Sequence, residues 1–286
     1  RVVSPREVAG RDFAFGLGWF GGGVHWIFIS CHRYGNMDVA SAAACTALLV
    51  AYLALFPALA LYAARRLGGA FLLAGPGAFG LAEWLRSWLL TGFPWLAPGY
   101  SQIDGPLGAY APLAGVAGVG LALTAVAAAL VALVQSPRKP WPALLTLALI
   151  GGGALSLQGR DWSTPAGPAL DIALLQGNVE QQMKWDPAHF EATLARYLDL
   201  TAAQRGADVV IWPENAIPAL PSEVPDGYFD AVRAAAGRSA VLIGMPTGAR
   251  DGPYYNAIAQ ITAPGGEYRK RHLVPFGEYV PLKRQI

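Results

Sequence analysis

Two charged residues at the ends of expected strands are the first candidates for chemistry, and Glu214 is the more informative. It follows Trp212 and Pro213 at the end of the expected strand Asp208–Trp212. In open α/β sheets, ligands bind beyond the carboxyl ends of strands, and Pro213 fixes the direction in which the chain leaves. An apolar setting suits a general base that works near neutral pH. Glu214 is therefore a candidate general base, although an ordinary loop glutamate also fits this position.

Lys270 is the second candidate, near the end of the expected strand Glu267–His272. A lysine ammonium can lose its proton or stabilise an oxyanion as a compact charge, which distinguishes it from arginine. A solvated basic edge strand is the alternative interpretation, because arginines flank Lys270 on both sides. Glu278 adds a second acidic group directly after the apolar turn Leu273–Gly277, and His272, on the other side of that turn, fits a core histidine equally well.

The elements expected to position these residues alternate along the chain from Ala169 onward. A short buried strand is expected first, and the pattern of apolar residues and turn signals then predicts helices and further strands. The strands are Leu170–Gln176, Asp208–Trp212 and Ala240–Gly244, the helices are Phe190–Arg205 and Tyr228–Ala236, and Tyr255–Thr262 with Glu267–His272 form a hairpin. This order predicts a layered α/β domain.

The part of the chain before residue 159 has a different composition. Hydrophobic residues make up 54% of the chain and charged residues only 14%, against about 25% charged in average soluble domains, and the charges are sparse up to residue 158. A bilayer core of roughly 30 Å needs about 20 apolar helical residues. Five segments qualify or nearly do so: Phe13–Cys31, Val39–Ala64, Ala70–Leu90, Tyr110–Val134 and Trp141–Leu157. We therefore expect a membrane domain of about five spans at 1–158 and a second domain at 159–286, with buried helices of a large soluble protein as the alternative.

Charge patterning predicts how the chain is oriented. The arginines and lysines of the expected loops concentrate on one side of the membrane, which the positive-inside rule assigns to the cytoplasm. An odd number of spans then places the second domain outside the cytoplasm. The net charge of +2, without a basic stripe, argues against a nucleic-acid partner. The two cysteines, Cys31 and Cys45, offer neither zinc-ligand spacing nor a disulfide framework.

The loop Gly92–Gln102 is rich in aromatic residues, proline and glycine, and it contains Trp95 and Tyr100. Tryptophan and tyrosine favour the headgroup level of a bilayer, so an interfacial anchor is one interpretation. A floor or gate for a lipid substrate is the other. Just before this loop, Glu83 and Arg86 lie three apart on one helix face. Such a pair is costly in a span unless it is paired, faces a cavity or snorkels to the surface.

Several stretches resemble known families. Trp212–Glu214 and Lys270–Pro281 resemble the nitrilase superfamily, and the second stretch looks specifically like the bacterial apolipoprotein N-acyltransferases. Further matches to that family are Gly16–Phe20 with His25–Trp26, Leu90–Trp95 with Tyr100–Pro106, and Gln176–Asn178 with Lys184–Trp185. The resemblance covers nearly the whole chain, including its membrane part. It implies a multi-span α-helical membrane domain followed by an α/β domain of the nitrilase-like αββα type, the latter incomplete.

The resemblance also implies a Glu-Lys-Cys triad. Glu214 matches the general base, and Lys270 matches the lysine that stabilises the tetrahedral intermediate. Glu278 matches a second acidic residue of the site, and Trp185 matches an aromatic residue near the acyl pocket. The family's nucleophilic cysteine follows the Pro-Phe-Gly-Glu motif, and the sequence stops before it. We therefore expect a fragment that lacks N-terminal and C-terminal parts and is inactive by itself.

The chemistry implied by the resemblance is ping-pong acyl transfer. A phospholipid donates its acyl chain to the cysteine, and the thioester acylates the α-amino group of a diacylated apolipoprotein's N-terminal diacylglyceryl-cysteine. No metal or organic cofactor is implied, and the location implied is the bacterial inner membrane with the catalytic domain facing the periplasm. The alternatives are a membrane-tethered nitrilase-type amidase and a non-catalytic lipid-binding membrane protein.

Overall fold

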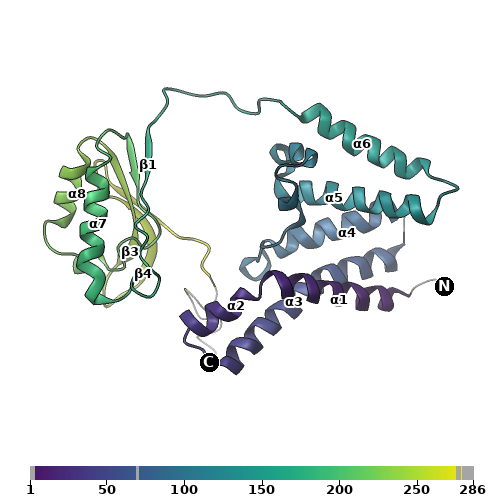
Figure 1. Cartoon of the computed structure of the whole chain (residues 1–286), viewed down its shortest axis with the longest axis horizontal. Helices are drawn as coiled ribbons and strands as arrows, with labels where there is room; N and C mark the ends of the chain where they lie inside the picture. The colour runs from purple at the N-terminus through teal and green to yellow at the C-terminus, as the bar shows by residue number, and fades with distance from the viewer. Residues whose placement is uncertain (1–3, 69–70, 275–277, 279–286) are drawn as a thin grey trace. The chain divides into compact units, whose positions relative to one another are not determined.

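The computed structural model describes residues 4–68, 71–274 and 278. The chain divides into two compact units. One consists of Arg1–Thr164 together with Val274–Ile286, and the other is Pro165–Leu273. The first unit is built from helices and the second around a sheet (Figure 1). This order confirms the predicted fold class, a helical region with apolar helices followed by a sheet-containing domain.

The first unit contains six α-helices among its described residues, joined by short 3-10 and π-helical turns. They are α1 (Pro5–Gly23), α2 (Trp26–Ile29), α3 (Val39–Leu67), α4 (Phe71–Arg86), α5 (Ala111–Gln135) and α6 (Trp141–Leu157). The side chain of Ser4 accepts from the backbone N–H of Glu7, whose carboxylate accepts from that of Ser4, so α1 begins with a capping box. Asp38 caps α3 by accepting from two backbone N–H groups.

Neighbouring helices pack in sequence, α3 against α4, α4 against α5 and α5 against α6, and α1 packs on α3. Gly16 permits the close approach of α1 and α3, because a Cβ there would lie 2.7 Å from the Cα of Ala54. Beside it, Phe20 of α1 and Val24, the residue that caps the C-terminus of α1, are buried against Val50 and Leu53 of α3. The C-terminal end of α1 and the middle of α3 therefore form one packed cluster, against which Phe93 and Leu96 of the loop after α4 pack.

Among the described residues, two helical segments are long and apolar enough to cross a membrane, Val39–Arg66 and Pro106–Gln135. A third results if Pro5–Gly23 and Trp26–Tyr34, which are bent by 51° at the break between them, count as one span. Trp141–Leu157 is apolar but shorter. By length and composition the described residues thus give two spans, or three with the bent pair, and the predicted number of about five stays a prediction.

The second unit is organised around a five-stranded sheet in the order β1-β2-β3-β4-β5. The first three strands are parallel and the last two run antiparallel. The strands are β1 (Ile172–Leu174), β2 (Val209–Ile211), β3 (Ala240–Gly248), β4 (Tyr254–Gln260) and β5 (Gly266–Arg269). Helices α7 (Phe190–Ala202) and α8 (Tyr228–Ala236) lie on one face of the sheet (Figure 1), and the core of the unit lies between them and the strands.

One expectation for this unit is wrong, because the first strand is not buried. Ala173 faces the core, but Ile172 and Leu174 are 51% and 75% exposed. Alternate residues of a strand point to opposite faces, and α7 and α8 cover only the face to which Ala173 belongs. The apolar sequence of this strand therefore reflects two apolar faces, of which one is exposed among the described residues.

Candidate active site

The end of β2 is fixed by the residue that precedes the Pro-Glu pair. Trp212 is fully buried, and its ring stacks on that of Tyr197 in α7 with the centroids 4.7 Å apart. Its indole Nε1 donates to the hydroxyl of Thr201 at 3.2 Å, and its backbone N–H donates to the carbonyl of Leu242 in β3 at 2.8 Å. These contacts define where the chain leaves the sheet before Glu214.

The turn after Trp212 then directs Glu214 outward. Gly244 of β3 lies directly against this turn, where a Cβ would be 2.2 Å from the carbonyl oxygen of Pro213 and 2.7 Å from the Cα of Glu214. Asn215 adopts the left-handed region at φ 49°, which asparagine tolerates better than most residues. The carboxylate of Glu214 therefore leaves the carboxyl end of β2 in a defined direction, where ligands of open α/β sheets bind.

Lys270 meets Glu214 across the sheet. Its ammonium donates to Oε1 of Glu214 at 3.0 Å, and the two side chains are 32% and 60% exposed. Asn256 of β4 donates its side-chain amide to the same carboxylate oxygen, and its carbonyl accepts from the backbone N–H of Lys270 at 2.8 Å. At such exposure an ion pair contributes only about 0–1 kcal/mol to stability. The contact is therefore more informative about positioning than about stability.

Lys184 approaches Glu214 from the segment between β1 and α7. Its ammonium donates to the backbone carbonyl of Glu214 at 2.9 Å. Burial lowers the pKa of Lys184 below its usual value, and the nearby carboxylate of Glu214 offsets only part of this effect. The next residue, Trp185, has a largely exposed ring. Lys184 therefore connects the segment that carries Trp185 to the turn that carries Glu214.

Asn256 and Lys184 are the two residues of this cluster that the sequence interpretation missed. Asparagine is depleted in strands, so Asn256 in the otherwise apolar run of its strand was an available signal. Lys184 stands beside Trp185 in a stretch that matches the family, but only the tryptophan was singled out. Neither signal gives a contact with Glu214, because the contacts depend on how distant segments pair.

The cluster has the parts of a site for proton transfer and charge stabilisation. The carboxylate of Glu214 accepts from the amide of Asn256 and the ammonium of Lys270 beyond the carboxyl end of β2. A carboxylate oriented in this way can accept a proton from a thiol or hydroxyl that binds next to it. The adjacent Lys270 can stabilise negative charge that develops on a carbonyl oxygen. Among the residues that the structure describes, no three or more His, Cys, Asp and Glu side chains gather closely enough to hold a metal ion.

Comparison with known proteins assigns the chain to a family. Residues 1–130 match the model of the apolipoprotein N-acyltransferase N-terminal domain, and residues 171–285 match that of the carbon-nitrogen hydrolases. The apolipoprotein N-acyltransferase of Methylococcus capsulatus is 44% identical over 290 residues, which cover 98% of this chain and 58% of the relative. That of Pseudomonas syringae pv. tomato is 42% identical over 299 residues, covering 99% and 59%. The chain belongs to the apolipoprotein N-acyltransferase family.

Membership confirms the resemblance drawn from the sequence, and with the apolar helices it makes the chain part of a bacterial membrane protein. The chain spans somewhat under three fifths of the length of these N-acyltransferase relatives. A third relative with this name, from Chromobacterium violaceum, is 41% identical over 97% of the chain and 56% of its own length. The two family models match residues of both units, so the likeness is not confined to the sheet-containing unit.

The remaining predicted site residues belong to the first unit. Trp95 is 57% exposed and contacts the ring of Trp26 edge-on with the centroids 5.4 Å apart, and Tyr100 is also exposed. Glu278 accepts from the backbone N–H of Val274 at 2.7 Å. Residues 275–277 and 279–281 of the N-acyltransferase motif lie outside the described residues. The structure thus brings Glu214 and Lys270 together within the second unit and places Trp95, Tyr100 and Glu278 in the first.

Three further sequence interpretations can be compared with the structure. His272 is exposed, so the interpretation as a core histidine is wrong. Cys31 and Cys45 are free thiols of intermediate exposure in the helical unit. The pair Glu83 and Arg86 does not snorkel, because the arginine is buried and bonded to the glutamate.

Proposed function

We propose that the protein to which this chain belongs transfers an acyl chain to the α-amino group of an apolipoprotein through a cysteine thioester. The observation that carries the proposal is the contact of 3.0 Å between Lys270 Nζ and Glu214 Oε1 at the carboxyl end of β2. A candidate general base and a cation that lie in contact beyond the carboxyl ends of strands suit acyl transfer through a thiol. The relatives' printed name, apolipoprotein N-acyltransferase, supports the same reaction.

In the proposed first half-reaction, Glu214 accepts the proton of the family's cysteine thiol while the sulfur attacks the ester carbonyl of a phospholipid. Lys270 stabilises the oxyanion of the tetrahedral intermediate. When the intermediate collapses, the carbon–oxygen bond breaks and the lysophospholipid leaves with a proton returned from Glu214. The acyl chain remains on the cysteine as a thioester.

In the proposed second half-reaction, the α-amino group of a diacylglyceryl-cysteine attacks the thioester. The amide bond forms, the carbon–sulfur bond breaks, and the proton lost by the amine restores the thiol through Glu214. Trp185 contacts the acyl chain near the base, and Trp95 and Tyr100 contact the lipid substrates at the helical unit. Glu278 acts as the second acidic residue of the site.

The proposed location is the bacterial inner membrane, with the sheet-containing unit in the periplasm. The concentration of positive charges on one set of loops supports this orientation, and the apolar helices support membrane association. The family's cysteine corresponds to neither Cys31 nor Cys45. We therefore expect it within the part of the relatives' length that this chain does not span.

The test uses the product of the complete coding sequence in its membrane. A phospholipid with a labelled acyl chain and a diacylated lipopeptide are added, and mass spectrometry follows the label. We expect an acylated enzyme first and then a triacylated lipopeptide, both absent in the Glu214→Gln variant. Release of free fatty acid or ammonia without lipopeptide acylation would instead support the amidase alternative. A complete coding sequence without a further cysteine would overturn the proposal.

A further inference from the structure

A buried arginine lies inside the helical unit, at the end of α4. Arg86 is only 2% exposed, and a charge in such a place is costly unless it is fully paired. Its Nε donates to Oε1 of Glu83 at 3.0 Å and its Nη2 to Oε2 at 2.6 Å, so the guanidinium fork holds the whole carboxylate. The ring of Phe20 in α1 lies 5.2 Å from the guanidinium carbon. The pair is thus built into the core of the unit.

The remaining nitrogen of Arg86 points to a loop that comes after α4. Nη1 donates to the backbone carbonyl of Phe93 and to that of Trp95 at 2.9 Å. In the other direction, the backbone N–H of Phe93 donates to the carbonyl of Arg86 at 2.9 Å. One side chain therefore fixes two alternate carbonyl groups of the segment Gly92–Pro98, and the geometry needs the planar five-donor fork of an arginine.

The same loop has an unusual backbone. Leu90, Thr91 and Leu96 have φ angles of 53°, 76° and 60°, a region that residues with a side chain seldom adopt. Gly92 is at φ 81°, and a Cβ there would lie 2.0 Å from the carbonyl oxygen of Ser87. Backbones of this kind persist only where the surroundings determine them, and they cluster at ligand clamps and other functional sites.

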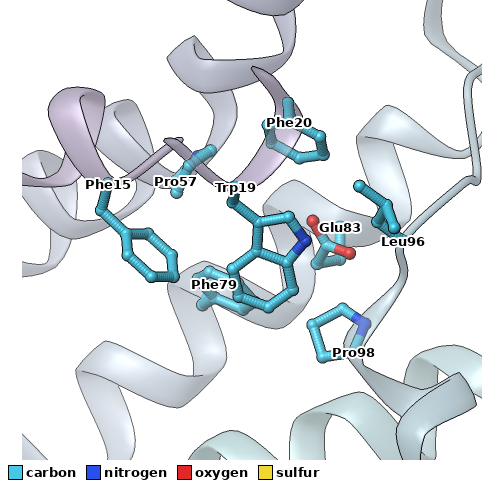
Figure 2. A pocket seen from close by; sticks show the side chains of 8 residues that line it. All are labelled: Phe15, Trp19, Phe20, Pro57, Phe79, Glu83, Leu96 and Pro98. Atoms are coloured by element: carbon cyan, nitrogen blue, oxygen red, sulfur yellow. The ribbon is translucent and has the colours of Figure 1, made fainter. Parts of the chain in front are cut away.

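Apolar anchors hold the loop from its other side. Phe93 and Leu96 pack against the cluster formed by α1 and α3, and Gly23 makes room for Leu96, because a Cβ there would be 2.2 Å from its Cδ1. Figure 2 shows Leu96 and Pro98 beside the carboxylate of Glu83. The cavity left between them measures about 10 Å³, which is room for about one water molecule. The loop is therefore packed down onto the helices.

Within Gly92–Pro98, the exposed residues are Pro94 and Trp95. The ring of Trp95 is 57% exposed, while its carbonyl is held by Arg86. It meets the exposed ring of Trp26 in α2 edge-on, with an interplanar angle of 66°. Two indole rings with apolar faces and polar N–H groups suit the boundary between lipid headgroups and acyl chains. The contact partner that fits this pair is thus a lipid.

We propose that Arg86 is a positioning residue that, together with Glu83, holds Gly92–Pro98 as a preformed platform and presents the Trp26–Trp95 pair to an acyl chain of a lipid substrate. That this lipid is a substrate rests on the proposed function. Of the floor and the gate that the sequence left open for this loop, the platform corresponds to the floor, because Gly92–Pro98 is fixed at two carbonyls and by two apolar anchors.

The experiment uses the product of the complete coding sequence in nanodiscs, with two readouts that need no turnover. Hydrogen exchange followed by mass spectrometry reports on peptides that cover Leu89–Pro98, with peptides of α3 and α5 as an internal measure of folding. Quenching of tryptophan fluorescence by phospholipids with brominated acyl chains reports on lipid contact, and the difference between the chain and its Trp95→Phe variant gives the share due to Trp95. The variants are Arg86→Gln, Arg86→Lys and Glu83→Gln.

Two matched controls accompany them. Arg33→Gln removes an exposed arginine from the same unit, and Trp84→Phe removes an exposed tryptophan from the outer face of α4. We expect exchange in Leu89–Pro98 to become about tenfold faster or more in Arg86→Gln and Glu83→Gln, as for a local opening made easier, with α3 and α5 unchanged. The Trp95 share of the quenching falls in these variants, whereas the share due to Trp84 stays the same.

Arg86→Lys keeps the charge but loses the fork, so its loop exchange is expected between that of the chain and that of Arg86→Gln. If Arg86→Gln also accelerates exchange in α3 and α5, the test of the platform rests on Arg86→Lys and Glu83→Gln. The platform would be overturned if exchange of Leu89–Pro98 in Arg86→Gln and Glu83→Gln stays within about twofold of that in the unaltered chain. It would also be overturned if the Trp95 share of the fluorescence quenching is unchanged in these variants. Because neither readout depends on acyl transfer, an inactive enzyme with these results intact would count against the proposed function alone.

Discussion

Lys270 and Glu214 are separated by 56 positions in the sequence, yet the ammonium of one lies 3.0 Å from a carboxylate oxygen of the other. The contact joins the end of β5 to the turn after β2, with β3 and β4 between them in the sheet. Asn256 completes it by donating to the same oxygen. The site is therefore assembled by sheet pairing and not by any local motif.

The first prediction concerns the two charged residues. In the product of the complete coding sequence, we expect Glu214→Gln and Lys270→Ala to abolish acyl-enzyme formation, because a general base alone contributes about 10²–10⁴-fold to the rate. Membrane insertion should be unchanged. Glu267→Gln, which removes an exposed carboxylate from the same hairpin, is the control and should keep its activity. Acylation of the enzyme in either active-site variant would refute the assigned roles.

The second prediction concerns Asn256, which shares the carboxylate of Glu214 with Lys270. Without its amide the carboxylate is less firmly oriented, so Asn256→Ala should slow acylation by about tenfold, equivalent to about 1.4 kcal/mol. The measurement is single-turnover acylation by a labelled phospholipid. Gln260→Ala, at the other end of β4, serves as the control. An Asn256→Ala rate equal to that of the control would remove Asn256 from the site.

Local elements were the most predictable part of this chain. The expected helix Tyr228–Ala236 has the observed bounds, because its apolar spacing is regular and Gly237 ends it at φ 66°, where glycine is favoured. Glu214 was predicted to stand at the carboxyl end of a strand, and it does. Signals that lie within about ten residues of one another thus translated directly into structure.

Contacts between distant segments were not predictable in this way. The burial of the first strand depends on which face α7 and α8 cover, and the sequence alone did not indicate that face. Asn256 reaches Glu214 only because β4 pairs with β3 in the register that sets Asn256 opposite Pro246. Likewise, the spacing of Glu83 and Arg86 predicted a pair, but nothing local indicated the two loop carbonyls that the arginine also holds.

The third prediction concerns Lys184 and pH. Because burial lowers the pKa of Lys184 below 10.5, the unfolded chain binds more protons than the folded chain between the lowered pKa and 10.5. The free energy of unfolding of the second unit should therefore rise with pH across this window. As pH falls through the lowered pKa, this contribution is lost and the free energy of unfolding levels off. Lys184→Met has no such group and should lack this dependence.

Pulse proteolysis in urea measures this difference, because it reports the folded fraction of a unit at each pH. The informative quantity is the free energy of unfolding of the chain minus that of Lys184→Met, followed from pH 8 to about 10.5. Lys139→Met, in the helical unit, controls for general effects of lysine titration. A flat difference across the window would mean that the burial of Lys184 has no energetic consequence.

The last prediction concerns Gly244, on which the direction of Glu214 depends. A methyl group there would lie 2.2 Å from the carbonyl oxygen of Pro213, so Gly244→Ala must displace either β3 or the turn that carries the carboxylate. Overpacking of this kind costs about 1–3 kcal/mol. Gly206→Ala is a matched control, because a Cβ at Gly206 meets nothing within 4 Å. We expect Gly244→Ala to lower both the urea midpoint of the second unit and the acylation rate. The loss of rate should persist at temperatures where the variant is fully folded, since the displaced turn misplaces Glu214 even in the folded state. A folded Gly244→Ala variant with the full acylation rate would show that the site tolerates this displacement and that the close approach serves packing alone.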